Sequence, residues 1–230
     1  MLDGSGLHYG KGFGFLGFYI VVPECRGRGY GLPLWDRALE QFGTRNIGLD
    51  GVKDQQDNYR KSGFNLAYSN IRYVWNKRVP AGPTTTPCIV PVDQVRMDTL
   101  TSYDRLCFSV PRPDFLEAWT QQPDSVTLVW QENEAIRGYG AIRQCREGWK
   151  VGPLFADHPG IAEHLLLALC DGLPDQGSIY LDVPEVNKEA IRLATGLGMH
   201  EVFGTARMYN RYSPDIATQR IFGVTSFELG

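Results

Sequence analysis

The 230-residue chain contains an internal repeat, and this repeat limits the possible folds more than any other feature of the sequence. Three short segments recur in the same order at offsets of 131 to 135 residues. The matched segments are Gly29–Gly31 with Gly160–Ala162, Leu49–Asp50 with Leu181–Asp182, and Gly63–Phe64 with Gly198–Met199. Both copies place these matches at the same points of a predicted strand–loop–helix–strand–helix order. We therefore predict an α/β (α+β) chain in which one mixed-sheet fold occurs twice in tandem.

A proline-rich segment between the two copies shows no apolar periodicity, which is typical of a linker. The predicted organisation is a partial first domain at residues 1–79, a linker at 80–87, a second domain at 88–212 and a tail at 213–230. The second domain opens with a strand predicted at 88–92, and the repeat offset places the counterpart of this strand before Met1. We therefore expect the first domain to lack its opening strand and helices.

The composition argues against several classes of protein. A formal net charge of −3 without a basic block argues against nucleic acid or an anionic membrane surface as the main partner. The longest apolar stretch, Phe13–Val22, is interrupted by glycine and is shorter than the ~20 residues that a membrane-spanning helix needs. Five cysteines lie far apart without a CxxC pair, which predicts reduced thiols, no metal site and a cytoplasmic protein.

The segment PECRGRGYG, from Pro23 to Gly31, lies between a predicted strand and a predicted helix. Glycines there let backbone N–H groups approach an anion, and the start of the helix adds partial positive charge. Two arginines add cationic donors suited to phosphate. The residues expected at a diphosphate are Arg26, Gly27, Arg28, Gly29, Tyr30 and Gly31. The spacing fits neither a P-loop, because no Gly-Lys-Ser/Thr follows, nor the G-x-G-x-x-G of a Rossmann fold.

This loop resembles the coenzyme A pyrophosphate loop of the GCN5-related N-acetyltransferase (GNAT) superfamily. In that family Gln/Arg-x-x-Gly-x-Gly/Ala follows a strand ending in Val-x-Pro, and this chain has Arg26-x-x-Gly29-x-Gly31 after Val21-Val22-Pro23. The resemblance implies acetyl-CoA as the co-substrate, held partly by backbone groups of the preceding strand. The strand residues so implied are Tyr19, Ile20 and Val21. A glycine-rich turn with two solvated arginines is the alternative interpretation of the loop.

A second segment, Tyr59-Arg60-Lys61-Ser62-Gly63-Phe64, is similar to the family pattern Tyr-x-Lys-x-Gly-Phe. The resemblance implies that Tyr59 protonates the departing coenzyme A thiolate, a role that suits a phenol with a reference pKa of about 10. Aromatic packing near a helix end is the alternative for this side chain. The family often places an Asn seven residues before the tyrosine, but Val52 stands there. Asn58 is the candidate coenzyme contact in its place, although its position differs.

The second copy departs from the pattern at its loop, where Asp157 takes the place of Arg26 and would repel a diphosphate. Ala194 stands at the position of the tyrosine. We therefore expect a divergent copy without a working coenzyme site. This pairing is similar to tandem GNAT proteins of the YitH-like type. Their second-domain segments resemble Gly138–Arg143, Val151–Asp157 and Leu181–Asn187.

Asp50 is the candidate general base because it ends the strand beside the predicted coenzyme strand, although a solvated loop carboxylate is the commoner fate of such a residue. The favoured hypothesis is an acetyl-CoA-dependent N-acetyltransferase in which an amine attacks the thioester directly. The alternative is a non-catalytic acyl-CoA-binding or scaffold protein. The acceptor is open between a small-molecule amine and a protein lysine, and a homodimer stays open as well.

Overall fold

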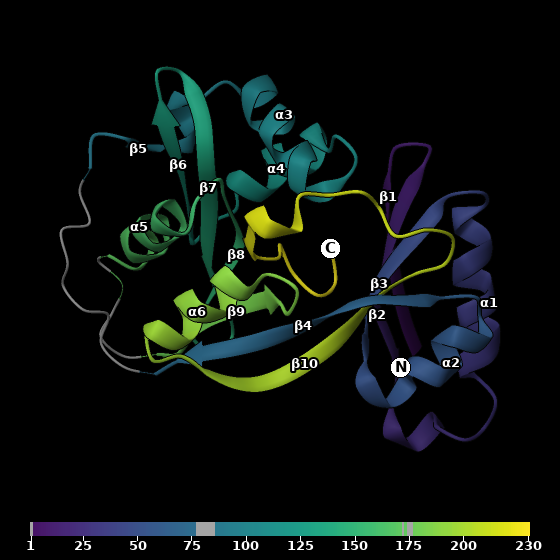
Figure 1. Ribbon diagram of the computed structural model, residues 1–230. Coiled ribbons are helices and arrows are strands. Elements are labelled where there is room, and N and C mark those ends of the chain that lie inside the picture. The colour runs from purple at the N-terminus through teal and green to yellow at the C-terminus, as the bar shows by residue number, and fades with distance from the viewer. Residues whose placement is uncertain (1, 77–85, 172, 174–176) are drawn as a thin grey trace. The chain divides into compact units, whose positions relative to one another are not determined.

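The computed structural model describes residues 2–76, 86–171, 173 and 177–230. The chain forms two compact units (Figure 1). Unit 1 consists of Met1–Tyr68, Thr205–Pro214 and Phe227–Gly230, and unit 2 consists of Ser69–Gly204 and Asp215–Ser226. The predicted linker at 80–87 falls almost entirely outside the described residues. Among the residues that are described, no helix has the length and hydrophobicity needed to cross a membrane.

Unit 1 is built around a mixed sheet. Its elements are β1 (Leu2–Tyr9), β2 (Phe13–Val21), α1 (Gly31–Phe42), β3 (Asn46–Val52), α2 (Gln56–Lys61), the start of β4 (Asn65–Trp75) and the end of β10 (His200–Tyr209). β1 and β2 pair antiparallel, β2 runs parallel to β3, and β10 pairs antiparallel with β3. In the core of the unit, Trp35 and Phe42 of α1 pack with Leu16, Ile47 and Leu49 of the sheet. Sequence reasoning missed β1, because LDGSGLHY holds glycine and serine where a strand normally alternates apolar side chains.

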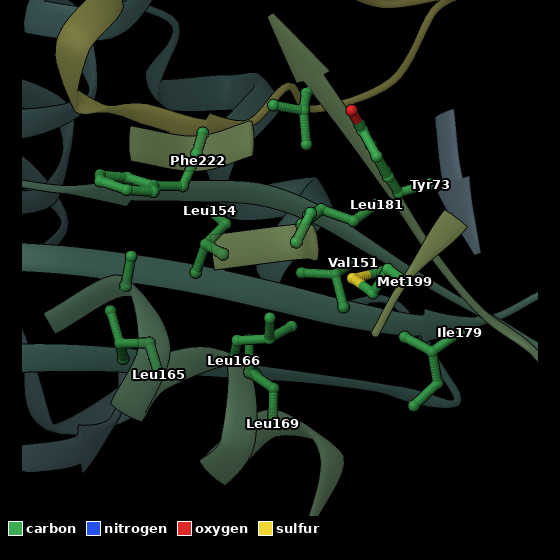
Figure 2. Packing of buried hydrophobic residues seen from close by; sticks show 14 of the residues in the cluster. Tyr73, Val151, Leu154, Leu165, Leu166, Leu169, Ile179, Leu181, Met199 and Phe222 are labelled. Carbon is green, nitrogen blue, oxygen red and sulfur yellow. The ribbon is translucent and has the colours of Figure 1, made fainter. Parts of the chain in front are cut away.

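Unit 2 is larger and contains the remaining elements. They are β5 (Ile89–Pro91), α3 (Met97–Phe108), α4 (Pro113–Thr120), β6 (Ser125–Glu132), β7 (Ala135–Gln144), β8 (Trp149–Ala156), α5 (Pro159–Cys170), β9 (Ile179–Pro184), α6 (Lys188–Gly196) and β11 (Ile221–Gly223). β5 to β8 form an antiparallel meander, and β8 runs parallel to β9. Figure 2 shows part of its core, where leucines of α5 pack with Val151, Leu154 and Leu181. Phe222, from the predicted tail, belongs to the same core.

The internal repeat predicted from the sequence is visible in the order and pairing of the elements. The series β1–β2–α1–β3–α2–β4 corresponds to β7–β8–α5–β9–α6–β10. In each series the first two strands pair antiparallel, and the second runs parallel to the third. Within the described part of unit 1, nothing corresponds to β5, α3, α4 and β6 of unit 2.

The last strand of each series pairs with the other copy. β4 follows the helix of the first copy, but its residues Asn70–Trp75 pair with β9 of unit 2. β10 follows the helix of the second copy, but its residues Thr205–Tyr209 pair with β3 of unit 1. The compact units are therefore interleaved in sequence, whereas the predicted ranges 1–79 and 88–212 are continuous. Strand patterning could not reveal the exchange, because alternation shows which face is buried and not which strand lies alongside.

A buried ion pair accompanies each exchanged strand. In unit 1, Arg207 of β10 donates from Nε and an Nη to the two carboxylate oxygens of Asp50 at 3.0 and 2.6 Å. In unit 2, Arg72 of β4 does the same to Asp182 at 2.7 and 2.8 Å, and Lys150 adds a contact at 2.9 Å. Burial alone would raise the pKa of Asp182, but the charges of Lys150 and Arg72 hold this pKa below its ordinary value. Each bidentate pair thus fixes one exchanged strand.

We expect Asp50→Ala to lower the free energy of unfolding by about 3–5 kcal/mol, because it leaves the Arg207 charge buried without a partner. Replacing both members, as Asp50→Leu with Arg207→Met, should recover most of that loss. Asp57→Ala is the matched control, since this carboxylate is 85% exposed and pairs with Arg60 at the surface. Guanidinium unfolding measures all three, and a double variant no more stable than Asp50→Ala would contradict the role of the pair.

Candidate functional site

The glycine-rich loop leaves β2 through a short 3-10 helix at Pro23–Cys25. Gly27 and Gly29 follow with φ of 73° and 79°, in the left-handed region where a side chain is strained. The Nε of Arg26 donates to the carbonyl oxygen of Val21 at 2.9 Å, so the arginine also closes the loop on the end of β2. Arg26 and Arg28 are exposed. The predicted loop residues therefore form a cationic and solvent-accessible turn whose conformation depends on glycine.

The helix α1 begins at Gly31, directly after the loop. Tyr30 occupies the N-cap position without a side-chain hydrogen bond, and the first turn holds no acidic residue. The N–H groups of a helical first turn lack partners inside the helix, and here no N-cap side chain accepts from them. Gly31 is required by a close approach, because a Cβ there would lie 2.5 Å from the hydroxyl oxygen of Tyr19. This helix start suits an anion.

β2 and β3 pair with each other over only the first part of their length. Their parallel ladder runs from Phe13↔Asn46 to Leu16↔Leu49, although both strands continue beyond it. On the other edge of β2, two residues lie between Gly17 and Ile20, opposite a single residue of β1 between Asp3 and Ser5, which is a β-bulge. Phe18, inside the bulge, has a φ of 50°, which is uncommon for a residue with a side chain. Phe18 and Ile20 are half exposed. We call the part of β2 and β3 beyond Leu16 and Leu49, where their shared parallel ladder has ended, the splay of unit 1.

The Tyr59 ring packs on β3, whereas the glycine-rich loop follows β2, the other strand of the splay. A Cβ on Gly51 would lie 2.7 Å from Cδ2 of the Tyr59 ring, so the ring covers the backbone of that glycine. Trp35 of α1 joins this ring to Tyr19, with ring centroids 5.5 and 5.2 Å apart, and donates from Nε1 to the Ser62 hydroxyl at 2.9 Å. Burial raises the pKa of Tyr59, and nearby Tyr19 raises it further. The phenol therefore keeps its proton at neutral pH.

The structure corrects the sequence-based assignment of Asp50 as a general base. Its side chain is fully buried and both carboxylate oxygens accept hydrogen bonds from Arg207. Both oxygens of this carboxylate are thus engaged by a cation, and its burial leaves it without contact to solvent. Asn58 is exposed and donates to Gln55 Oε1 at 2.7 Å, while Val52 is exposed at the end of β3. The other predicted residues lie on β2, in the loop that follows it, at the start of α1 and on α2.

The equivalent region of unit 2 is occupied by the protein itself. The helix start at α5 carries Pro159, and the His158 ring accepts from the Gly160 N–H at 3.1 Å. Asp157 accepts from the Tyr103 hydroxyl at 2.9 Å and faces Arg220 at 3.5 Å. The loop groups that bind an anion in the predicted site thus have internal partners here. The described residues contain no group of three or more His, Cys, Asp or Glu side chains placed to hold a metal ion.

Comparison with known proteins places these features in a family context. Residues 100–223 match the family described as acetyltransferase (GNAT) domain, which is more than half of the chain. Holothin acyltransferase of Pseudoalteromonas sp. (strain SANK 73390) is 28% identical over 228 residues, covering 98% of this chain and 76% of that protein. The uncharacterized N-acetyltransferase YitH of Bacillus subtilis is 21% identical over 216 residues, covering 94% and 76%.

A solved structure supports the fold. The crystal structure of an acetyltransferase from Pyrococcus horikoshii aligns with a TM-score of 0.83 at 24% identity, covering 99% of this chain and 75% of that one. At this identity the likeness shows the fold alone. The mixed α/β fold predicted from the sequence is confirmed by it.

The position of the Tyr59 ring can be tested through Gly51. We expect Gly51→Ala to force the ring away and to lower the free energy of unfolding by about 1–3 kcal/mol, because a methyl group there overlaps ring atoms. The near-ultraviolet circular dichroism of the Tyr19–Trp35–Tyr59 cluster should change with it. Gly12→Ala is the control, since a Cβ at Gly12 meets open space. Identical aromatic spectra for the two variants would contradict the packing described.

Proposed function

Because this chain belongs to the GNAT acetyltransferase family, we propose that unit 1 binds an acyl coenzyme A, with acetyl-CoA as the natural donor, and transfers the acyl group to an amine. The observation that carries the proposal is the contrast between two equivalent places. In unit 1 the splay adjoins a cationic glycine-rich loop and a tyrosine, whereas in unit 2 the same place is filled by the chain's own residues. The activity is therefore assigned to the first copy.

The coenzyme diphosphate binds at the loop, where Arg26 and Arg28 supply positive charge and the start of α1 at Gly31 supplies N–H groups of a first helical turn. From there the extended thiol arm follows β2 back toward the bulge, because that strand is the only one leading from the loop into the splay among the described residues. Exposed apolar side chains at Phe18 and Ile20 give the arm a surface to cover. The thioester then lies at the bulge.

Acyl transfer proceeds by direct attack. The amine nitrogen bonds to the thioester carbon, and a backbone N–H at the bulge stabilises the charge that develops on the carbonyl oxygen. The carbon–sulfur bond breaks, and the thiolate takes the proton of the Tyr59 hydroxyl. The phenolate recovers a proton from solvent, and the proton released by the nitrogen passes to solvent as well. No carboxylate of the chain is assigned as base, because Asp50 is held by Arg207.

That last point also favours a second candidate, a non-catalytic acyl-CoA-binding or scaffold protein. Such a protein would use the same loop and strand without needing a proton acceptor. The two candidates are separated by whether bound acetyl-CoA is turned over in the presence of amines. Small-molecule amines and protein lysines both belong in that panel. A homodimer and a cytoplasmic location remain part of the proposal.

Coenzyme binding should depend on the charges of the loop. We expect Arg26→Gln and Arg28→Gln each to weaken coenzyme A binding by about tenfold or more, because each removes a charge-assisted hydrogen bond. Arg146→Gln in unit 2 is the matched control, since it removes one exposed positive charge elsewhere. Calorimetric titration measures the affinity. S-acetyl-pantetheine, which lacks the diphosphate, should be used equally well by all three variants, and a loss there would contradict the assignment.

Tyr59→Phe should lower kcat by about 10²-fold while leaving the affinity for acetyl-CoA nearly unchanged, because only the transferred proton is removed. The pKa of Tyr59 is raised above 10 by burial, so the acid form persists across the neutral range. We therefore expect the ratio of the wild-type kcat to the Tyr59→Phe kcat to stay constant between pH 7 and about pH 9.5. Free-thiol release measures both profiles. Equal kcat values would remove Tyr59 from the mechanism.

A further inference from the structure

The C-terminal segment passes over the same glycine in both copies of the repeat. Gly17 follows the last parallel pair of β2 and β3, Leu16↔Leu49, and Gly152 follows the last parallel pair of β8 and β9, Val151↔Leu181. A Cβ on Gly152 would lie 2.5 Å from the carbonyl oxygens of Val224 and Thr225. A Cβ on Gly17 would lie 2.9 Å from Cα of Glu228 and closer still to its carbonyl oxygen. Both glycines are required by backbone lying directly on them.

In unit 2 the segment closes the splay completely. Ile221 and Gly223 of β11 pair with Phe155 and Leu154 of β8. The Val224 N–H donates to the Asp182 carbonyl oxygen of β9 at 2.8 Å. The segment therefore hydrogen-bonds to both strands that have separated, and Phe222 fills the core beneath it (Figure 2). This added strand leaves no place for the arm of a coenzyme.

In unit 1 only the last residues of the segment reach the splay, and they cover its inner end. The backbone of Glu228 lies on Gly17, and the carbonyl oxygen of Leu229 accepts a hydrogen bond from the Tyr9 hydroxyl at 2.8 Å. Phe227 is buried beside them. Phe18 and Ile20, further along β2 toward the loop, stay half exposed. The splay is thus closed at Gly17 and open toward Arg26.

We propose that Glu228 and Leu229 form the inner wall of the acyl site in unit 1 and restrict the transferred group to short acyl chains of acetyl or propanoyl size. The inference rests on the proposed function, in which the thiol arm runs along β2 from the loop to the bulge. An acyl chain continues in the direction of that arm, toward Gly17. The space between Gly17 and Glu228 does not admit even a methyl group. A wall of backbone cannot rotate aside as a side chain does.

The affinities of acetyl-, butanoyl- and hexanoyl-CoA, measured by calorimetry, test the wall without requiring turnover. For the wild type we expect affinity to fall as the acyl chain lengthens. A variant ending at Ser226 lacks the wall, so its ratio of hexanoyl- to acetyl-CoA affinity should rise at least about tenfold, because the added CH₂ groups gain apolar burial. Thermal melting establishes that this variant is folded.

A full-length variant keeps the test decisive if the shortened chain does not fold. Tyr9→Phe removes the hydrogen bond to the Leu229 carbonyl oxygen and should shift the same affinity ratio by about two- to tenfold in the same direction. Tyr212→Phe is the matched control, since Tyr212 is 62% exposed in unit 1. Glu228→Ala should leave the ratio unchanged, because the wall consists of backbone.

The outcomes separate the wall from the proposed function. If no coenzyme A thioester binds to the wild type, both are overturned. If acetyl-CoA binds and is turned over, while the wild type, the shortened chain and Tyr9→Phe rank the three thioesters identically, the wall alone is overturned. A shift caused by Glu228→Ala and not by Tyr9→Phe would assign the selectivity to the carboxylate and would also overturn it.

Discussion

The architecture of this chain depends on two reciprocal ion pairs between an aspartate at a strand end and an arginine on an exchanged strand. Asp50 holds Arg207 in unit 1, and Asp182 holds Arg72 in unit 2. The Asp50–Arg207 pair is costly to break, because both of its side chains are buried, whereas Asp182 is buried and is held by Lys150 as well as by Arg72. The same position in the repeat therefore has a structural task in both copies. In unit 1 this task engages both oxygens of the carboxylate that the sequence offered as a general base.

The two copies diverge at the place where the second and third strands of the repeat separate. Separation leaves backbone groups that need partners, since buried N–H and C=O groups are nearly always hydrogen-bonded. In unit 2 the chain supplies β11 and the following residues as partners for both strands. In unit 1 the backbone of Glu228 lies on Gly17, and the Leu229 carbonyl oxygen accepts a hydrogen bond from Tyr9. The same segment thus covers the point of separation in both copies, but it adds the strand β11 in unit 2.

The chemistry of unit 1 follows from packing as much as from residue identity. Trp35 connects Tyr19 on β2 to Tyr59 on α2, and Gly51 lets the Tyr59 ring lie on β3. Burial of that ring raises its pKa and keeps a proton in place at neutral pH. The positive charge of the loop lies at the outer end of β2, whereas the phenol lies by β3. A long, thin donor with an anionic end fits this separation of roles.

The sequence by itself determined the repeat, its order of strands and helices, and the loop from Arg26 to Gly31, because these depend on local periodicity, glycine conformation and charge within a few residues. Only the tertiary structure decided which strands exchange, that Asp50 is bound by Arg207, and that the tail covers Gly17 and Gly152. These contacts join residues 72 to 211 positions apart in the sequence. Alternation along a strand specifies its buried face but not its neighbour, so long-range pairing is settled only when the whole chain packs.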